Sequence, residues 1–241
     1  MQLHVYKDAE ALSEDVAKWI AETISRTLQT KDRFTIALSG GSTPQRLHKI
    51  LAASPCKEQI DWSKLHIFWG DERAVPFNDS RNNAKMAYDT LLNFVSVPAS
   101  QIHVMRTDIG PEDSAAEYEK ILHTYFDDQS LSFDLVLLGM GDDGHTLSLF
   151  PGTEVVHEEK AWAVAYFLKA QDMYRITLTK SIVNRSARVA FLTTGTGKAH
   201  ALKEVLQGAY NPDLYPSQEI KPIGDLHWFV DEAAAAQLEG K

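Results

Sequence analysis

The chain has 241 residues, a formal net charge of -9 at pH 7 and a single cysteine, Cys56. A single domain spanning residues 1–241 is expected at this length, and the acidic balance argues against nucleic-acid or anionic-membrane partners, which call for a basic surface. One cysteine allows neither an intrachain disulfide nor a cysteine-based zinc site, and the lack of a leader pattern or an apolar run of roughly 20 residues predicts a soluble cytoplasmic protein.

Strand-like and helix-like patterns alternate along the chain. Short apolar or alternating runs predict strands at Leu3–Tyr6, Phe34–Leu38, Leu65–Trp69, Ile102–Met105, Phe133–Leu138, Ala161–Phe167, Tyr174–Thr179, Arg188–Thr193 and His227–Val230. Apolar residues at helical spacing predict helices at Asp8–Gln29, Pro44–Leu51, Asn83–Leu92, Glu112–Phe126, Ala199–Leu206 and Ala233–Ala236. This alternation predicts an α/β fold with a mostly parallel sheet between layers of helices.

The turn after the second predicted strand, Ser39–Pro44, has the composition of an anion site. Gly40 and Gly41 precede Ser42 or Thr43 as helix cap, with Pro44 near the first helical position. Unpaired NH groups and the helix dipole favour an anion there, and phosphate is the natural candidate. The spacing matches neither a Walker loop nor GxGxxG, so a plain capped turn is equally compatible with it.

Charged residues follow two other predicted strands. Asp71, Glu72 and Arg73 come directly after Leu65–Trp69, where they can bind substrate or pair with one another. The Arg73 guanidinium can fork onto a phosphate. Lys198 begins a predicted helix, where a cation opposes the dipole unless an anion is held at the same place; a solvated lysine is the alternative.

The stretch Phe133–Pro151 joins a very apolar run to a polar turn that contains three glycines. The run suits a strand buried on both faces, and the turn carries Asp142, Asp143 and His145. Ligands of open α/β sheets bind at the carboxyl ends of the strands, so His145 stands where a catalytic base is expected. A tight turn with a solvated histidine is the alternative interpretation.

Five separated motifs together resemble the 6-phosphogluconolactonase family. They are LSGGSTP at 38–44, WGDER at 69–73, LLGMGDDGHTLSLFPG at 137–152, RITLT at 175–179 and GTGKAHAL at 195–202. The resemblance covers nearly the whole chain in the family's order. It implies hydrolysis of 6-phospho-D-glucono-1,5-lactone in the oxidative pentose phosphate pathway. It also implies a three-layer, Rossmann-like fold shared with glucosamine-6-phosphate deaminase and ribose-5-phosphate isomerase, with no metal and no cofactor.

The resemblance also assigns roles to residues. His145 matches the family's proposed catalytic base, with Asp143 as the carboxylate that orients it. The expected substrate- and phosphate-binding residues are Gly40, Gly41, Ser42, Asp71, Arg73, Arg175 and Lys198. A neutral imidazole can take a proton from water that attacks the lactone, and NH groups of the glycine turn are expected to stabilise the oxyanion. The family commonly has proline where this chain has Asp142, and its usual Ser-Asn pair corresponds to Asn82-Asn83, to which no role is carried over.

Two other functions are compatible with parts of the sequence. Glucosamine-6-phosphate deaminase resembles the chain at GGSTP and DGH, but its pattern continues to a glutamate that assists ring opening, where this chain has Phe150. A non-catalytic sugar-phosphate sensor would need a DNA-binding segment or a lost catalytic group, and the sequence has neither a basic extension nor a missing histidine. The partner expected is a small sugar-phosphate lactone, and the oligomeric state stays open.

Overall fold

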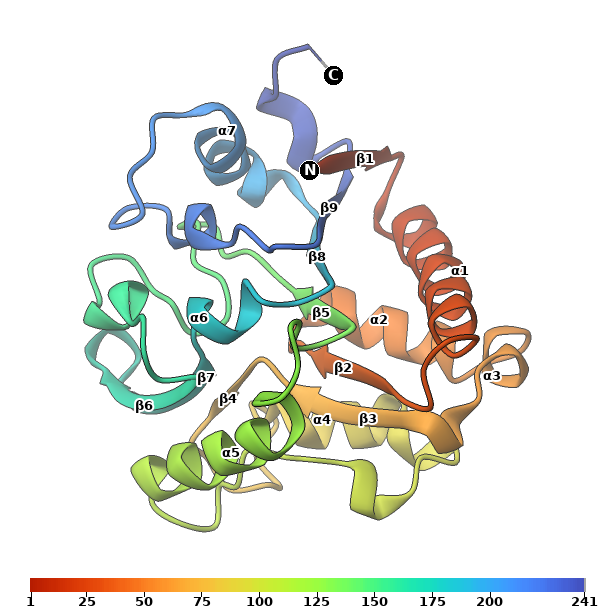
Figure 1. The fold of residues 1–241 in the computed structure, drawn as a ribbon. Coiled ribbons are helices and arrows are strands. Elements are labelled where there is room, and N and C mark those ends of the chain that lie inside the picture. The colour runs from red at the N-terminus through yellow and green to blue at the C-terminus, as the bar shows by residue number, and fades with distance from the viewer. Residues whose placement is uncertain (241) are drawn as a thin grey trace.

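A six-stranded sheet, in which all neighbouring strands run parallel, forms the centre of the protein (Figure 1). The computed structural model describes residues 1–240. In spatial order the strands are β1 (Gln2–Tyr6), β9 (Asp225–Asp231), β8 (Arg188–Thr193), β5 (Leu135–Leu138), β2 (Phe34–Leu38) and β3 (Leu65–Trp69). This topology confirms the expected α/β fold with a mostly parallel sheet.

Alternate residues of the central strands enter two separate cores, one on each face of the sheet. Every residue of β2 is buried; Ile36 and Leu38 pack in one core and Ala37 in the other. The register that pairs Ile36 with Leu135 and Ala37 with Val136 keeps neighbouring strands in step. Continuous apolar runs therefore form these strands because both faces exclude water.

The first core lies under four helices of the N-terminal half. They are α1 (Ala9–Thr27), α2 (Ser42–Leu51), α3 (Cys56–Gln59) and α4 (Asn83–Thr90). Helix α1 begins at a cap residue, Asp8, whose carboxylate accepts the NH groups of Glu10 and Ala11. Its buried stripe includes Leu12 and Val16. The periodicity of the sequence thus predicts this layer correctly.

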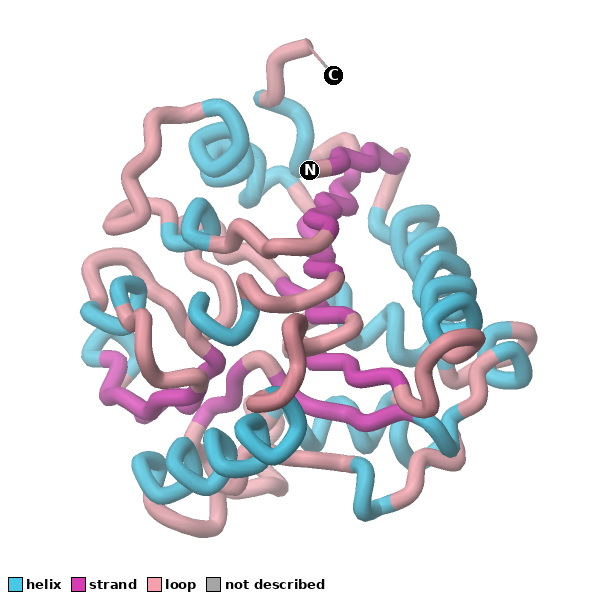
Figure 2. The backbone as a smooth tube through the Cα atoms, in the orientation of Figure 1, coloured by secondary structure: helices cyan, strands magenta, loops and turns pink. Residues whose placement is uncertain are grey.

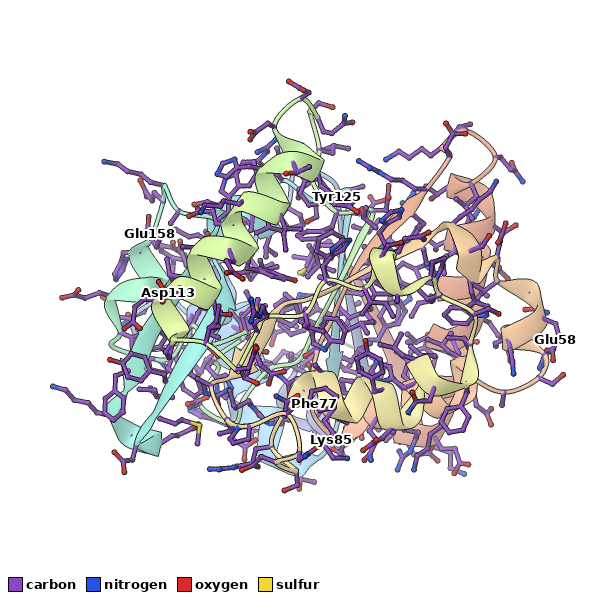
Figure 3. All side chains as sticks on the ribbon, turned by 90° about the horizontal axis from the view of Figure 1, so that it is seen from below. Glu58, Phe77, Lys85, Asp113, Tyr125 and Glu158 are labelled. Carbon is purple, nitrogen blue, oxygen red and sulfur yellow. The ribbon has the colours of Figure 1, made fainter. Side chains whose placement is uncertain are left out.

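The second core is covered by α5 (Pro111–Phe126), α6 (Lys180–Val183), α7 (Ala199–Gln207) and a smaller sheet. Phe191 and Trp228 stack in it, with ring centroids 3.8 Å apart. Figure 3 looks onto the β3 edge and shows α5, with Asp113 and Tyr125, on one side and α4, with Lys85, on the other. The helices and the small sheet complete the layers on both sides.

The smaller sheet has three antiparallel strands, in the order β4 (Asp71–Arg73), β7 (Met173–Leu178) and β6 (Ala163–Leu168). Figure 2 shows its strands beside the main sheet rather than in line with it. The sequence predicts β6 and β7 to within two residues, but it does not predict that they leave the parallel sheet. Residues 71–73, for which no separate strand is predicted, form a strand because β7 supplies their hydrogen-bonding partner.

Two predicted elements are wrong. Ile102–Met105 is not a strand: Ile102 makes a single bridge to Ile67, and only the NH of His103 donates to the Ile67 carbonyl beside it. The terminal run forms a 3₁₀ turn, Ala234–Gln237, instead of an α-helix. Within residues 1–240, no helix combines the length and apolarity needed to cross a membrane.

Candidate active site

A cleft of about 280 Å³ opens at the carboxyl ends of β2, β5 and β8 and reaches the small sheet. Its lining includes all the predicted site residues except Asp143: Gly40, Gly41, Ser42, Asp71, Arg73, His145, Arg175 and Lys198. Parallel strands place their carboxyl ends at one edge, so segments more than 150 residues apart in sequence converge there. The structure brings the predicted residues together.

His145 is held by its own loop and by an aromatic ring. Its Nδ1 lies 2.6 Å from Asp143 Oδ1, which also accepts the His145 backbone NH at 3.1 Å. The imidazole stacks on Phe150, with centroids 4.0 Å apart and planes 21° apart. Asp143 therefore lies behind the imidazole rather than in the cleft, and His145 is fixed on two sides.

The Asp143 carboxylate determines which imidazole nitrogen is free. Partial burial raises the pKa of Asp143, but the hydrogen bonds and the charge interaction with His145, together with its own backbone NH, outweigh burial, so the pKa lies below the usual value. An ionised carboxylate can only accept, which places the proton of neutral His145 on Nδ1. The lone pair is then on Nε2, to which no group within residues 1–240 is hydrogen-bonded. This arrangement suits a general base.

The glycine turn supports His145 by close packing and by its own hydrogen bonds. A Cβ at Gly141 would overlap the imidazole and the Asp143 carboxylate, so only glycine fits there. The Gly141 NH donates to the His145 carbonyl at 2.8 Å, and the Gly144 NH donates to the Gly141 carbonyl at 3.1 Å. These two NH groups are already used, which corrects the expectation that they are free to bind an oxyanion.

The segment that contains Tyr215 and Ser217 packs against the same turn and hydrogen-bonds to it. Ser217 donates both its backbone NH, at 3.0 Å, and its hydroxyl, at 2.8 Å, to the Gly144 carbonyl. The Tyr215 side chain lies directly against Gly144. Just beyond His145, Leu147 has φ +54°, a conformation that costs a non-glycine residue of order 1 kcal/mol or more. Contacts from the C-terminal segment therefore hold the loop that carries His145 in a single conformation.

Helix α2 presents an uncapped N-terminus to the cleft. The cap residue is Gly41, at φ +109°, and no side chain caps the helix, so the prediction of Ser42 or Thr43 as cap is wrong. Ser42 is instead the first helical residue, and the Thr43 hydroxyl lies 2.9 Å from that of Thr194. Glycine replaces the expected cap because the chain turns here through positive φ. NH groups without a side-chain cap are available to an anion.

Two arginines lie directly opposite each other on neighbouring strands of the small sheet. Arg73 and Arg175 are directly paired in the β4–β7 register. Arg175 Nη1 lies 3.3 Å from Asp71 Oδ2, and Arg73 Nη1 donates to the Arg81 carbonyl at 2.7 Å. Within the described chain, both Nε atoms are buried without a hydrogen-bond partner. Like charges directly opposite are destabilising, so this pair is a ready receptor for an anion.

Asp71 and Glu72 have different roles because successive strand residues point to opposite faces. Asp71 lines the cleft, and Ser148 Oγ donates to its Oδ2 at 2.7 Å. Glu72 instead accepts the NH groups of Arg73, Asn83 and Ala84. Burial raises the pKa of Glu72 to about 7, although these three NH groups oppose the rise. Glu72 thus joins α4 to β4 and does not line the cleft.

Lys198 follows β8 and is the residue before α7, as predicted. Its Nζ lies 2.5 Å from Asp142 Oδ1, in the turn after the neighbouring strand β5. About a quarter of the lysine side chain, 26%, is exposed, against 71% of the aspartate side chain. Lys198 is therefore a cation of the cleft that already has an anionic partner.

Sequence reasoning gave no role to two residues that the structure places at the site. Asn83 lines the cleft, and its amide donates to the Asp71 carbonyl at 2.9 Å. Its position at the start of a helix, soon after Asp71–Arg73, was the available signal. In the sequence Phe150 stands out only because it replaces the deaminase glutamate, but in the structure it supports His145, and its ring centroid lies 5.4 Å from the Arg175 guanidinium.

Comparisons with known proteins agree with this architecture. Residues 7–228 match the family described as "Glucosamine-6-phosphate isomerases/6-phosphogluconolactonase". A probable chloroplastic 6-phosphogluconolactonase from Oryza sativa subsp. indica is 39% identical and covers 98% of this chain and 76% of its own length. The 6-phosphogluconolactonase of Nostoc sp. is 39% identical and covers 98% of both chains.

A solved structure extends the agreement to the fold. The 6-phosphogluconolactonase from Trypanosoma cruzi matches with a TM-score of 0.86 and 27% identity, over 99% of this chain and 97% of that chain. The similarity in sequence and structure thus spans almost all of the molecule. The chain belongs to the glucosamine-6-phosphate isomerase/6-phosphogluconolactonase family.

Proposed function

We propose that the protein hydrolyses 6-phospho-D-glucono-1,5-lactone to 6-phospho-D-gluconate, a step of the oxidative pentose phosphate pathway. The observation that carries the proposal is the oriented His145, whose unbonded Nε2 belongs to a cleft lined by Arg73, Arg175 and Lys198. Relatives 39% identical to this chain carry this activity in their names. The substrate partner is a small phosphorylated lactone, and a cytoplasmic location is part of the same proposal.

The proposed mechanism is general-base hydrolysis. Nε2 of His145 takes a proton from a water molecule as the water oxygen attacks the lactone carbonyl carbon. The tetrahedral intermediate then breaks its bond to the ring oxygen, which takes the proton back from the imidazolium. Asp143 keeps the imidazole oriented and stabilises its charged form, as the 2.6 Å hydrogen bond allows. No covalent intermediate is needed, because the ring ester is itself a good electrophile.

The proposed phosphate site has three sources of positive potential. Arg73 and Arg175 supply guanidinium groups whose buried Nε atoms have no hydrogen-bond partner within the described residues. Lys198 supplies an ammonium group, and the N-terminus of α2 supplies NH groups without a side-chain cap. A phosphate carries oxygens for all of these donors.

The test is the rate of disappearance of freshly generated lactone, with spontaneous hydrolysis subtracted. His145→Ala is expected to lower kcat by about 10³-fold, within the range typical of general-base catalysis. His157→Ala is the matched control, because His157 also pairs with an aspartate, Asp213, at 2.7 Å, but on the exposed surface. It should retain turnover within twofold. Wild-type turnover by folded His145→Ala would contradict the proposed role.

The alternative activity is glucosamine-6-phosphate deamination. Ring opening in that reaction needs a titratable partner, whereas Phe150 offers the histidine an apolar ring. The lactonase is therefore favoured. If wild-type protein leaves the lactone decay unchanged, turnover of glucosamine-6-phosphate decides for the deaminase, and binding of 6-phosphogluconate without any turnover decides for a sugar-phosphate sensor.

A further inference from the structure

The ion pair between Lys198 and Asp142 joins two turns at the mouth of the cleft. Lys198 lines the cleft, and its Nζ lies 2.5 Å from Asp142 Oδ1. A Cβ on Gly197 would come within 3.3 Å of Asp142 Oδ2, so the carboxylate rests over this glycine. Within residues 1–240, Asp142 has no other salt-bridge partner. Lys198, the proposed phosphate-binding cation, is therefore its one ion-pair partner within the described residues.

We propose that Asp142 is an internal competitor of the substrate phosphate for Lys198, and that it thereby sets the affinity of the site for phosphorylated ligands. The inference rests on the proposed function and concerns binding rather than the hydrolytic step. An ammonium group has three donors, and a carboxylate oxygen 2.5 Å from Nζ occupies one side of it. A phosphate must either displace this carboxylate or bind beside it against like charge.

The exposure of the two groups limits the size of the effect. Water reaches 71% of the Asp142 side chain and 26% of the Lys198 side chain, so the attraction between them is screened. Pairs of this kind are coupled weakly, which corresponds to an affinity change of about two- to fivefold. A shift of this size in KM and in product affinity is measurable, and it would leave the chemical step at His145 unchanged.

The first experiment compares Asp142→Asn with the wild type. The KM for the lactone and the equilibrium Kd for 6-phosphogluconate, measured by calorimetry, should both fall about two- to fivefold. Glu239→Gln is the matched control, because it removes an exposed carboxylate that pairs with Lys203 at 2.8 Å and changes the net charge equally. Its Kd and KM should stay within the error of the wild-type values.

A second comparison tests whether Lys198 transmits the effect. In a Lys198→Met background, Asp142→Asn should change the Kd much less than it does in the wild type, because the contested cation is gone. An unchanged or raised Kd in Asp142→Asn would overturn the proposal, since the carboxylate would then be neutral or would position Lys198 productively. Equal effects of Asp142→Asn and Glu239→Gln would also overturn it.

These binding measurements are independent of turnover. Protein that binds 6-phosphogluconate with the predicted order of affinities but does not hydrolyse the lactone contradicts the proposed function and supports the competitor role of Asp142. Protein that hydrolyses the lactone, but whose affinity for 6-phosphogluconate does not respond to Asp142→Asn, contradicts the competitor role alone.

Discussion

The two sheets of this protein differ in the residues that they bury. In the parallel sheet, strands such as β2 and β5 are entirely apolar at their centres and are buried on both faces. In the small sheet, β4 consists of Asp71, Glu72 and Arg73, and β7 carries the buried Arg175. Burial of apolar side chains in the parallel sheet stabilises the fold, whereas burial of charged side chains in the small sheet, next to the cleft, lowers the free energy of unfolding. The difference indicates that the parallel sheet mainly stabilises the fold, whereas the small sheet mainly supplies residues to the cleft.

The largest effect should follow from breaking the charge compensation in the small sheet. Asp71→Ala leaves Arg175, 4% exposed, without its carboxylate and should lower the free energy of unfolding by about 3 kcal/mol. Urea denaturation measures this loss. Asp89→Ala is the control, because it removes an exposed carboxylate paired with Lys85 and should cost less than about 1 kcal/mol. Equal costs would remove the distinction between the two sheets.

The layer over the parallel sheet contains a buried titratable group of its own. His48 on α2 is fully buried, and burial lowers its pKa to about 4. Its folded pKa lies below the unfolded value of 6.5, so its contribution to stability is present above pH 6.5 and is lost as the pH falls through about 4. This loss amounts to about 3 kcal/mol. His48→Gln should flatten the acid side of the unfolding free energy against pH, and parallel curves would contradict the prediction.

A smaller effect is expected from replacing the planar guanidinium of Arg175 by an ammonium group of the same charge. Arg175→Lys keeps the positive charge but loses the planar fork, and should raise KM about 10-fold with kcat within threefold. The control is Arg185→Lys, because Arg185 is partly buried and its guanidinium donates to the carbonyls of Phe126 and Gln129, away from the cleft. Its KM should stay within twofold. A kcat effect for Arg175→Lys larger than its KM effect would argue against remote phosphate binding.

The smallest predicted effect compares one threonine in each sheet. Thr177 accepts the Ser148 NH at 3.1 Å, and Thr35 accepts the Asp134 NH at 3.0 Å. Either residue changed to valine should lose about 1 kcal/mol of stability. Only Thr177→Val should also alter KM, because Ser148 donates to Asp71 in the cleft. Steady-state kinetics of the two variants, measured side by side, tests the separation of scaffold and site.

The same contrast explains how much of the fold the sequence predicts. The strands β2, β3 and β8 have the predicted bounds, because continuous burial leaves a continuous apolar run. The strand β4 was missed because its three charged residues carry no apolar signal and its partner, β7, lies about 100 residues further along the chain. The Ile102–Met105 prediction failed because an apolar run without a sustained partner does not become a strand.

For the site, the sequence predicts which residues take part better than it predicts which of them are in contact. The motifs indicated His145, Asp143 and the glycine turn, since these are neighbours in sequence. The opposition of Arg73 and Arg175 and the pairing of Lys198 with Asp142 depend on register and on loop conformation. Neither is encoded within one local window. The capping error at α2 has a local cause, because glycine at positive φ ended the turn before Ser42 could act as a cap.

The facing arginines have a consequence for the protein when no ligand is bound. Asp71 offsets part of their repulsion, and an anion held in the cleft would relieve the rest, so the fold and the ligand support each other. Phosphorylated ligands are therefore expected to raise the melting temperature in proportion to the logarithm of their concentration once the site is saturated. The protein should accordingly be most vulnerable to heat and to proteases when its substrate supply is exhausted.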